Sequence, residues 1–197
     1  VVGKANKDAL RADGFQIKAK EYAHLAGKSE QDYENAIAAV SEIVKTEKIV
    51  KDVGNLVENA KQNIIQAQNS LMKLETTYKI GNMDEANQAY REILELSRNT
   101  EKIMTDGEQN VKLINDYLGN IDKKLSSINA QHTEDNKSAL ADAMDKMSDK
   151  TQKTAYLAES LAIELDQQYE LMNEIMGKTK GFSDGDFQKN KKNTLES

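Results

Sequence analysis

Apolar residues recur between residues 36 and 78 in alternating steps of three and four. Only Thr46 breaks the apolar or aromatic character of this series. The positions are Ala36, Ala39, Ile43, Thr46, Val50, Val53, Val57, Ala60, Ile64, Ala67, Leu71, Leu74 and Tyr78. A 3.5-residue repeat that keeps its phase is typical of a helix packed along a left-handed seam. The pattern predicts one long helix over about residues 30–79.

A second series with the same period runs from residue 86 to residue 128. Its exceptions, Ser97, Thr100 and Gly107, cluster in the middle. The segment "KIGNMDEA", residues 79–86, separates the two series. In it Gly81 is suited to the left-handed conformation that ends helices, and residues 82–84 are suited to starting the next one. We therefore expect a second helix over about residues 84–128 and a long antiparallel helical hairpin.

Two glycines interrupt the hairpin arms. Folding the chain about residues 80–82 places Gly54 of the first arm nearly opposite Gly107 of the second. One interpretation is a joint, where the hairpin bends or a third segment packs closely. The other is two tolerated glycines, each costing about 1 kcal/mol relative to alanine.

A third helix is predicted over about residues 136–176. The polar segment "NAQHTEDN", residues 129–136, precedes it and offers Thr133 and Asp135 as caps. Gly177 and Gly181 are expected to end it. Its best seam is Leu140, Met144, Met147, Thr151, Thr154, Ala158, Leu161, Leu165, Gln168, Met172 and Ile175.

The interaction residues of the third helix are predicted within this seam. We expect it to dock on the hairpin through Leu161, Leu165, Met172 and Ile175. Gln168 interrupts this apolar series. We expect it at the edge of the bundle, where its amide reaches water, because a buried glutamine costs stability unless partners satisfy it.

The termini differ from the rest of the chain. Residues 1–28 read as a weak helical segment, interrupted at Gly14 and ended at Gly27, before Ser29 and Asp32 form a capping-box-like start. Residues 29–177 form the predicted helical bundle. Residues 178–197 lack apolar mass, and we expect a mobile tail there.

These elements define an all-α fold, an elongated three-helix antiparallel bundle built on a long helical hairpin. Composition agrees, with 30% charged residues, 5% aromatic residues and no proline in 197 residues. The net charge is −6, and acidic and basic residues are interspersed along the chain. A nucleic-acid-binding groove would need a cluster of basic residues, so this distribution argues against one. The absence of cysteine excludes disulfides and thiolate metal sites. No apolar run approaches the roughly 18–20 residues of a transmembrane span.

Residues able to support catalysis are few. Glu21 and His24 have the Glu-x-x-His spacing of di-iron bundles, but those bundles need a second such motif and two further glutamates. His132 falls in a polar turn. The sequence contains no glycine-rich phosphate loop and no serine nucleophile motif. We therefore expect a protein that is not an enzyme, with no cofactor and no metal.

Two resemblances bear on function. The stretch "LAIELDQQYELMNEI", residues 161–175, resembles a SNARE helix around its central glutamine, over about twenty residues. The stretches "TTYKIGNMDEANQAYREILEL", residues 76–96, and "KTQKTAYLAESLAIELDQQYELMNEI", residues 150–175, are similar to TrbJ-like minor-pilus proteins of conjugation and type IV secretion systems. SNARE motifs carry further apolar layers beyond the central one, whereas Gly177 ends the seam here.

The TrbJ-like resemblance implies a long helical hairpin that assembles at a pilus tip and mediates adhesion. It implies a periplasmic or secreted protein whose partners are pilus or secretion-channel subunits, with no catalytic residues to transfer. The alternative is a cytosolic coiled-coil adaptor, including a SNARE-like interaction protein.

Overall fold

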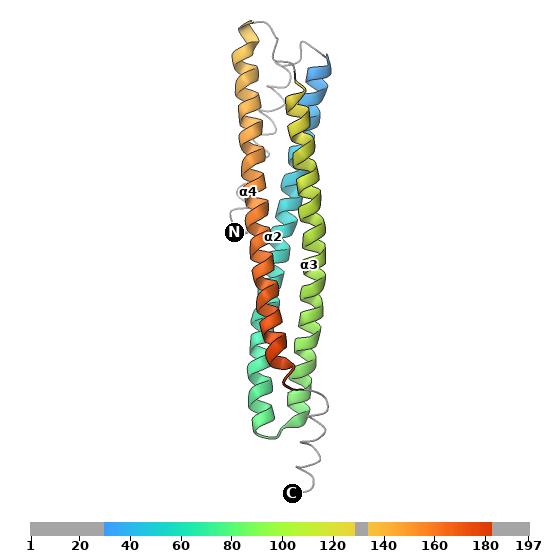
Figure 1. Cartoon of the computed structure of the whole chain (residues 1–197), viewed down its shortest axis with the longest axis vertical. Coiled ribbons are helices and arrows are strands. Elements are labelled where there is room, and N and C mark those ends of the chain that lie inside the picture. The colour runs from blue at the N-terminus through green and yellow to red at the C-terminus, as the bar shows by residue number, and fades with distance from the viewer. Residues whose placement is uncertain (1–29, 129–133, 183–197) are drawn as a thin grey trace. The chain divides into compact units, whose positions relative to one another are not determined.

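The described chain contains three helices, whose arrangement is drawn in Figure 1. They are α2 at Glu30–Lys79, α3 at Met83–Ser126 and α4 at Glu134–Thr179. The computed structural model describes residues 30–128 and 134–182, with side chains from 34 to 128 and from 144 to 182. The prediction of an all-α three-helix bundle is confirmed.

Each helix contributes to two compact units. Unit 1 contains the described residues up to Asn55 together with Glu108–Ala162, and unit 2 contains Leu56–Gly107 together with the described residues from Ile163 onward. Within each unit all three helices contribute buried side chains. Each unit is therefore a short three-helix bundle with its own core.

The core of unit 1 follows the predicted seams. From α2 it takes the seam residues between positions 36 and 53, and all of them are buried. From α3 and α4 it takes a second group of buried side chains, which are Ile114, Leu118, Ile121, Leu125, Met147, Ala158 and Leu161. Val40 is also buried although it lies outside the α2 seam. The seam in this unit is therefore wider than two positions per heptad.

The core of unit 2 includes one cluster built from all three helices. Its members from α2, α3 and α4 are Ile64, Ala67, Leu71, Leu74, Met83, Ala86, Ala89, Ile93, Met172 and Ile175. Small alanines alternate with large aliphatic side chains, so neighbouring helices interdigitate as close packing requires. Tyr78, Tyr90 and Phe182 pack against this cluster while remaining partly exposed.

The α2–α3 turn confirms the predicted role of Gly81. Gly81 has φ of 82° and is the residue with positive φ among the described residues. The amide of Asn82 donates to the carbonyl of Thr77 at 2.9 Å, and the amide of Gly81 donates to that of Tyr78 at 3.1 Å. This pair of bonds is the Schellman motif. The Asn82 side chain then accepts from the amide of Glu85 at 3.4 Å and caps α3.

The C-terminal end of α4 differs from expectation. The helix passes through Gly177, where the sequence predicted its end, and continues to Thr179, which is fully buried. Phe182 then packs edge-to-face on Tyr78, with ring centroids 4.9 Å apart. The first residues of the segment expected as a mobile tail are therefore packed into unit 2. The aromatic contact is worth about 1 kcal/mol beyond its buried area.

Several expectations concern residues outside the described part of the chain. They include the weak helical segment at residues 1–28, the caps proposed at Ser29 and Thr133, and the tail at residues 183–197. These expectations stay predictions.

Two glycine substitutions test the backbone argument. Gly81→Ala should lower the free energy of unfolding by about 1–2 kcal/mol, because an alanine Cβ is strained at positive φ. Gly119→Ala should raise it by up to about 1 kcal/mol, since Gly119 lies within α3 and a Cβ there meets nothing within 4 Å. Denaturant unfolding of both variants measures the difference, and the same sign for both would contradict this account.

Candidate functional site

The predicted interaction residues of α4 are buried inside the bundle. Leu161 belongs to unit 1, whereas Leu165, Met172 and Ile175 belong to unit 2. Met172 and Ile175 are members of the unit 2 core cluster. All four side chains therefore contribute to intramolecular packing and are not available at the surface to a partner.

Gln168 lies at a half-buried position of α4, and so does its neighbour Tyr169. The seam residues on either side, Leu165 and Met172, are almost completely buried. The glutamine therefore interrupts a closed seam at a place where its side chain still has access to solvent.

Gly107 of α3 lies against the side chain of Leu165 of α4. A Cβ built on Gly107 would clash with Cδ2 of Leu165, and Cδ1 of Leu56 lies 4.0 Å from the same position. The Leu165 side chain therefore occupies the space that any side chain at position 107 would need. Of the two interpretations of this glycine, close packing of a third segment is the one that the structure shows.

Buried threonines replace apolar residues at several seam positions without leaving a polar group unsatisfied. In unit 1 the hydroxyl of Thr46 donates to the carbonyl of Glu42 at 2.7 Å, and Thr151 donates to Met147 at 2.8 Å. Thr100 of unit 2 donates to Leu96 in the same way. Since each hydroxyl bonds to the carbonyl four residues earlier on its own helix, the side chain presents its methyl group to the core.

A buried ion pair joins α2 and α4 in unit 1. Lys150 Nζ lies 2.9 Å from Glu47 Oε1, and the two side chains are only 14% and 8% exposed. On the other side of α2, Lys124 of α3 lies 3.4 Å from Glu42. Charges this deep are tolerated only when they are paired, because burial removes their hydration.

The Glu47–Lys150 pair was not predicted from the sequence. The signal was present, since Glu47 directly follows the seam residue Thr46 and Lys150 directly precedes the seam residue Thr151. Positions that flank the seam are those that form ion pairs between neighbouring helices. The sequence pattern does not indicate which of the other two helices lies beside each flank of α2, so the partner of Glu47 could not be predicted.

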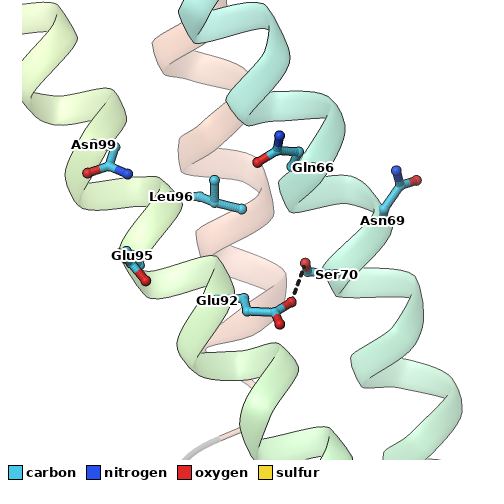
Figure 2. Close-up of a pocket in the computed structure, with 7 residues that line it drawn as sticks. All are labelled: Gln66, Asn69, Ser70, Glu92, Glu95, Leu96 and Asn99. Carbon is cyan, nitrogen blue, oxygen red and sulfur yellow. Dashed lines mark hydrogen bonds between the residues drawn. The ribbon is translucent and has the colours of Figure 1, made fainter.

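The described part of unit 2 also contains a polar groove between α2 and α3 (Figure 2). Its volume is about 490 Å³. The lining residues are Gln66, Asn69, Ser70, Glu92, Glu95, Leu96 and Asn99. The hydroxyl of Ser70 donates to Glu92 Oε2 at 3.1 Å across the groove.

The chemistry of this groove favours hydrogen bonding. Its amide side chains donate and accept hydrogen bonds, and its carboxylates accept them. Ser70 bonds to a carboxylate rather than to an imidazole, the base that usually activates a serine nucleophile. The groove is therefore suited to contact polar groups of a partner.

The contrast between Leu165 and Gln168 can be tested. Leu165→Ala should lower the free energy of unfolding by about 2–5 kcal/mol, because it opens a cavity in the unit 2 core. Gln168→Leu should change it by less than about 1 kcal/mol, since the amide is half-buried. Denaturant unfolding measures both values. A large loss for Gln168→Leu with little loss for Leu165→Ala would contradict the observed burial.

A mutant cycle tests the ion pair of unit 1. Lys150→Met should lower the free energy of unfolding by about 3 kcal/mol, because it removes the ammonium group beside a buried carboxylate. Adding Glu47→Leu should recover most of that loss. The matched control is Lys153→Met, whose exposed pair with Asp149 should contribute under about 0.5 kcal/mol. Equal losses for Lys150→Met and Lys153→Met would show that burial does not decide the effect.

Among the side chains described, at residues 34–128 and 144–182, no group of three or more histidine, aspartate or glutamate residues is placed to hold a metal ion. The histidines considered above, His24 and His132, lie outside these residues. Over the same part of the chain, no helix combines the length and the apolar character needed to cross a membrane. Comparisons with models of protein families, with curated proteins and with solved structures gave no match.

Proposed function

We propose that this protein is a non-catalytic, extracytoplasmic assembly and adhesion component of a conjugation or type IV secretion apparatus, similar to a minor pilus-tip protein. The TrbJ-like resemblance of residues 76–96 and 150–175 supports the proposal. The first stretch forms the α2–α3 turn and the start of α3, and the second lies in α4. A protein of this kind acts by presenting helical surfaces to pilus or secretion-channel subunits.

The observation that carries the proposal is the distribution of exposed apolar side chains. The apolar seams are closed inside each unit, yet unit 2 exposes a further set of large side chains. These are Ile65, Met72, Ile80, Ile163 and Leu171. Apolar surface left outside a completed core is typical of protein-binding surfaces when its members are neighbours.

The interactions that the polar side chains form also favour a binding function over a catalytic one. Buried hydroxyls bond within their own helices, and the buried charges pair across helix boundaries. The groove between α2 and α3 offers amides and carboxylates in an open surface. Side chains arranged in this way stabilise helix packing and contact a partner.

The proposal is tested in the cells that produce the protein. A photo-crosslinking residue at Ile80, which is 73% exposed in unit 2, should capture pilus or secretion-channel subunits. The chain should fractionate with periplasmic or secreted proteins, and deletion of its gene should reduce transfer of the apparatus's cargo. The matched control places the crosslinker at Lys48, an exposed α2 residue of unit 1.

Two outcomes would contradict this function. A cytosolic chain that crosslinks to cytosolic coiled-coil proteins would support the adaptor function instead. Normal transfer after gene deletion would remove the chain from the apparatus altogether.

A further inference from the structure

One ion pair spans the boundary between α2 and α4 in unit 2. Lys61 Nζ lies 3.9 Å from Glu164 Oε1. Residues four and eleven positions after Lys61 lie on the same side of α2, and they are Ile65 and Met72. Leu171 follows Glu164 by seven residues and lies on the same side of α4. An apolar stripe therefore continues along this boundary from the ion pair.

These apolar side chains are exposed even though their neighbours in the chain are buried. Ile65 is 58% exposed and Met72 is 65% exposed, whereas Ile64 and Leu71 immediately before them belong to the unit 2 core. Leu171 is 36% exposed. The core is complete without these three side chains. Their apolar surface is available to a partner in the described part of the chain.

The α4 side of this boundary is acidic. From residue 163 to residue 177 the helix carries Glu164, Asp166, Glu170 and Glu174 and no lysine or arginine. Glu164 faces Lys61, whereas no ion pair among the described residues involves the other three. Asp166, Glu170 and Glu174 are exposed. Glu174 lies three residues after Leu171 and Glu170 directly precedes it, so these two carboxylates border the apolar stripe, whereas Asp166 lies on another side of α4.

The α2 side adds further negative charge. Glu58 lies seven residues before Ile65 on the same side of α2, and Glu75 lies three residues after Met72. Both are exposed. The basic residues nearby are Lys61, which pairs with Glu164, and Lys79 and Lys178 at the end of their helices. Lys73 is also exposed, about 100° around α2 from Met72, and it is outnumbered by the carboxylates of this boundary. The middle of this boundary is therefore apolar with an acidic margin.

We propose that this surface, the α2–α4 face defined by Ile65, Met72, Leu171, Glu170 and Glu174, binds a basic amphipathic helix of a partner protein. The apolar stripe fits a helix with apolar residues at matching intervals, and the acidic margin attracts flanking lysines or arginines. The inference rests on the proposed assembly function and gives the chemistry of the partner that this face recognises.

The negative charge of this face also disfavours binding of a second copy of the chain there. In a symmetric dimer the same patch meets itself. Glu170 and Glu174 of one copy would then face the acidic margin of the other, and like charges brought together at an interface are unfavourable. A basic helix removes that repulsion and buries the same apolar side chains.

The test uses the full chain and two synthetic helical peptides of about 20 residues. Both peptides carry leucines at helical spacing, flanked by lysines in one and by glutamates in the other. The lysine peptide should bind, and its affinity should fall as salt rises. The glutamate peptide should bind at least about tenfold more weakly. Calorimetric titration measures both affinities.

Matched variants locate the binding site. The double variant Ile65→Gln/Met72→Gln should weaken binding of the lysine peptide by at least about tenfold, because it removes apolar area from the contact. The double variant Glu170→Gln/Glu174→Gln should weaken binding and reduce its salt dependence. Leu113→Gln, which changes an exposed apolar residue of α3 in unit 1, should leave the affinity unchanged. All of these positions are exposed, so thermal unfolding should show that each variant remains folded.

Several results would overturn the proposal. The proposal is wrong if the lysine peptide does not bind, or if both peptides bind with equal affinity. It is also wrong if Leu113→Gln weakens binding as much as Ile65→Gln/Met72→Gln does. Self-association of the full chain that the Ile65→Gln/Met72→Gln variant abolishes would assign the face to a second copy. These outcomes are separate from the cellular test. Peptide binding without crosslinks to the apparatus contradicts the proposed function alone, whereas crosslinks from Ile80 without peptide binding contradict the docking face alone.

Discussion

The fold depends on the burial of a narrow apolar stripe on each of three helices. Because a helix has 3.6 residues per turn, a 3.5-residue repeat gives an apolar stripe that winds slowly around the helix, and neighbouring helices must follow that stripe to cover it. The unit 2 cluster shows this arrangement, since α2, α3 and α4 all contribute to it. The same requirement explains the buried threonines, because Thr46 and Thr100 enter the seam by bonding their hydroxyls to their own helices.

The residues beside the stripe determine which helix lies on which side. One flank of α2 faces α3, as Glu42 with Lys124 in unit 1 and Ser70 with Glu92 in unit 2 demonstrate. The opposite flank faces α4 through Glu47 in unit 1 and through Lys61 in unit 2. Such flanking pairs contribute little apolar burial, but they distinguish the correct arrangement of helices from others with equal burial.

The surfaces that remain after this packing have different characters. In unit 2 the α2–α3 side forms a polar groove that includes Ser70 and Glu92, whereas the α2–α4 side exposes Ile65 and Met72 beside the acidic residues of α4. The four α4 residues that the sequence predicted to dock this helix on the hairpin are buried in the bundle. The residues that could contact other proteins are therefore those next to the seam in sequence, such as Met72, which directly follows a buried seam residue.

The sequence by itself determined the number of helices, their seams and the turn at Gly81, because periodicity and left-handed glycine geometry are local properties of the chain. It did not determine that α4 continues beyond Gly177, since the burial of Thr179 and the contact of Phe182 with Tyr78 offset the low helix propensity of glycine. Nor did it reveal the Glu47–Lys150 pair, and it left open whether Gly107 marks close packing of a third segment, which the contact with Leu165 shows. Both depend on which helix faces each side of its neighbour, and only the tertiary structure decides that, because residues about sixty or a hundred apart are brought together by packing rather than by the local pattern.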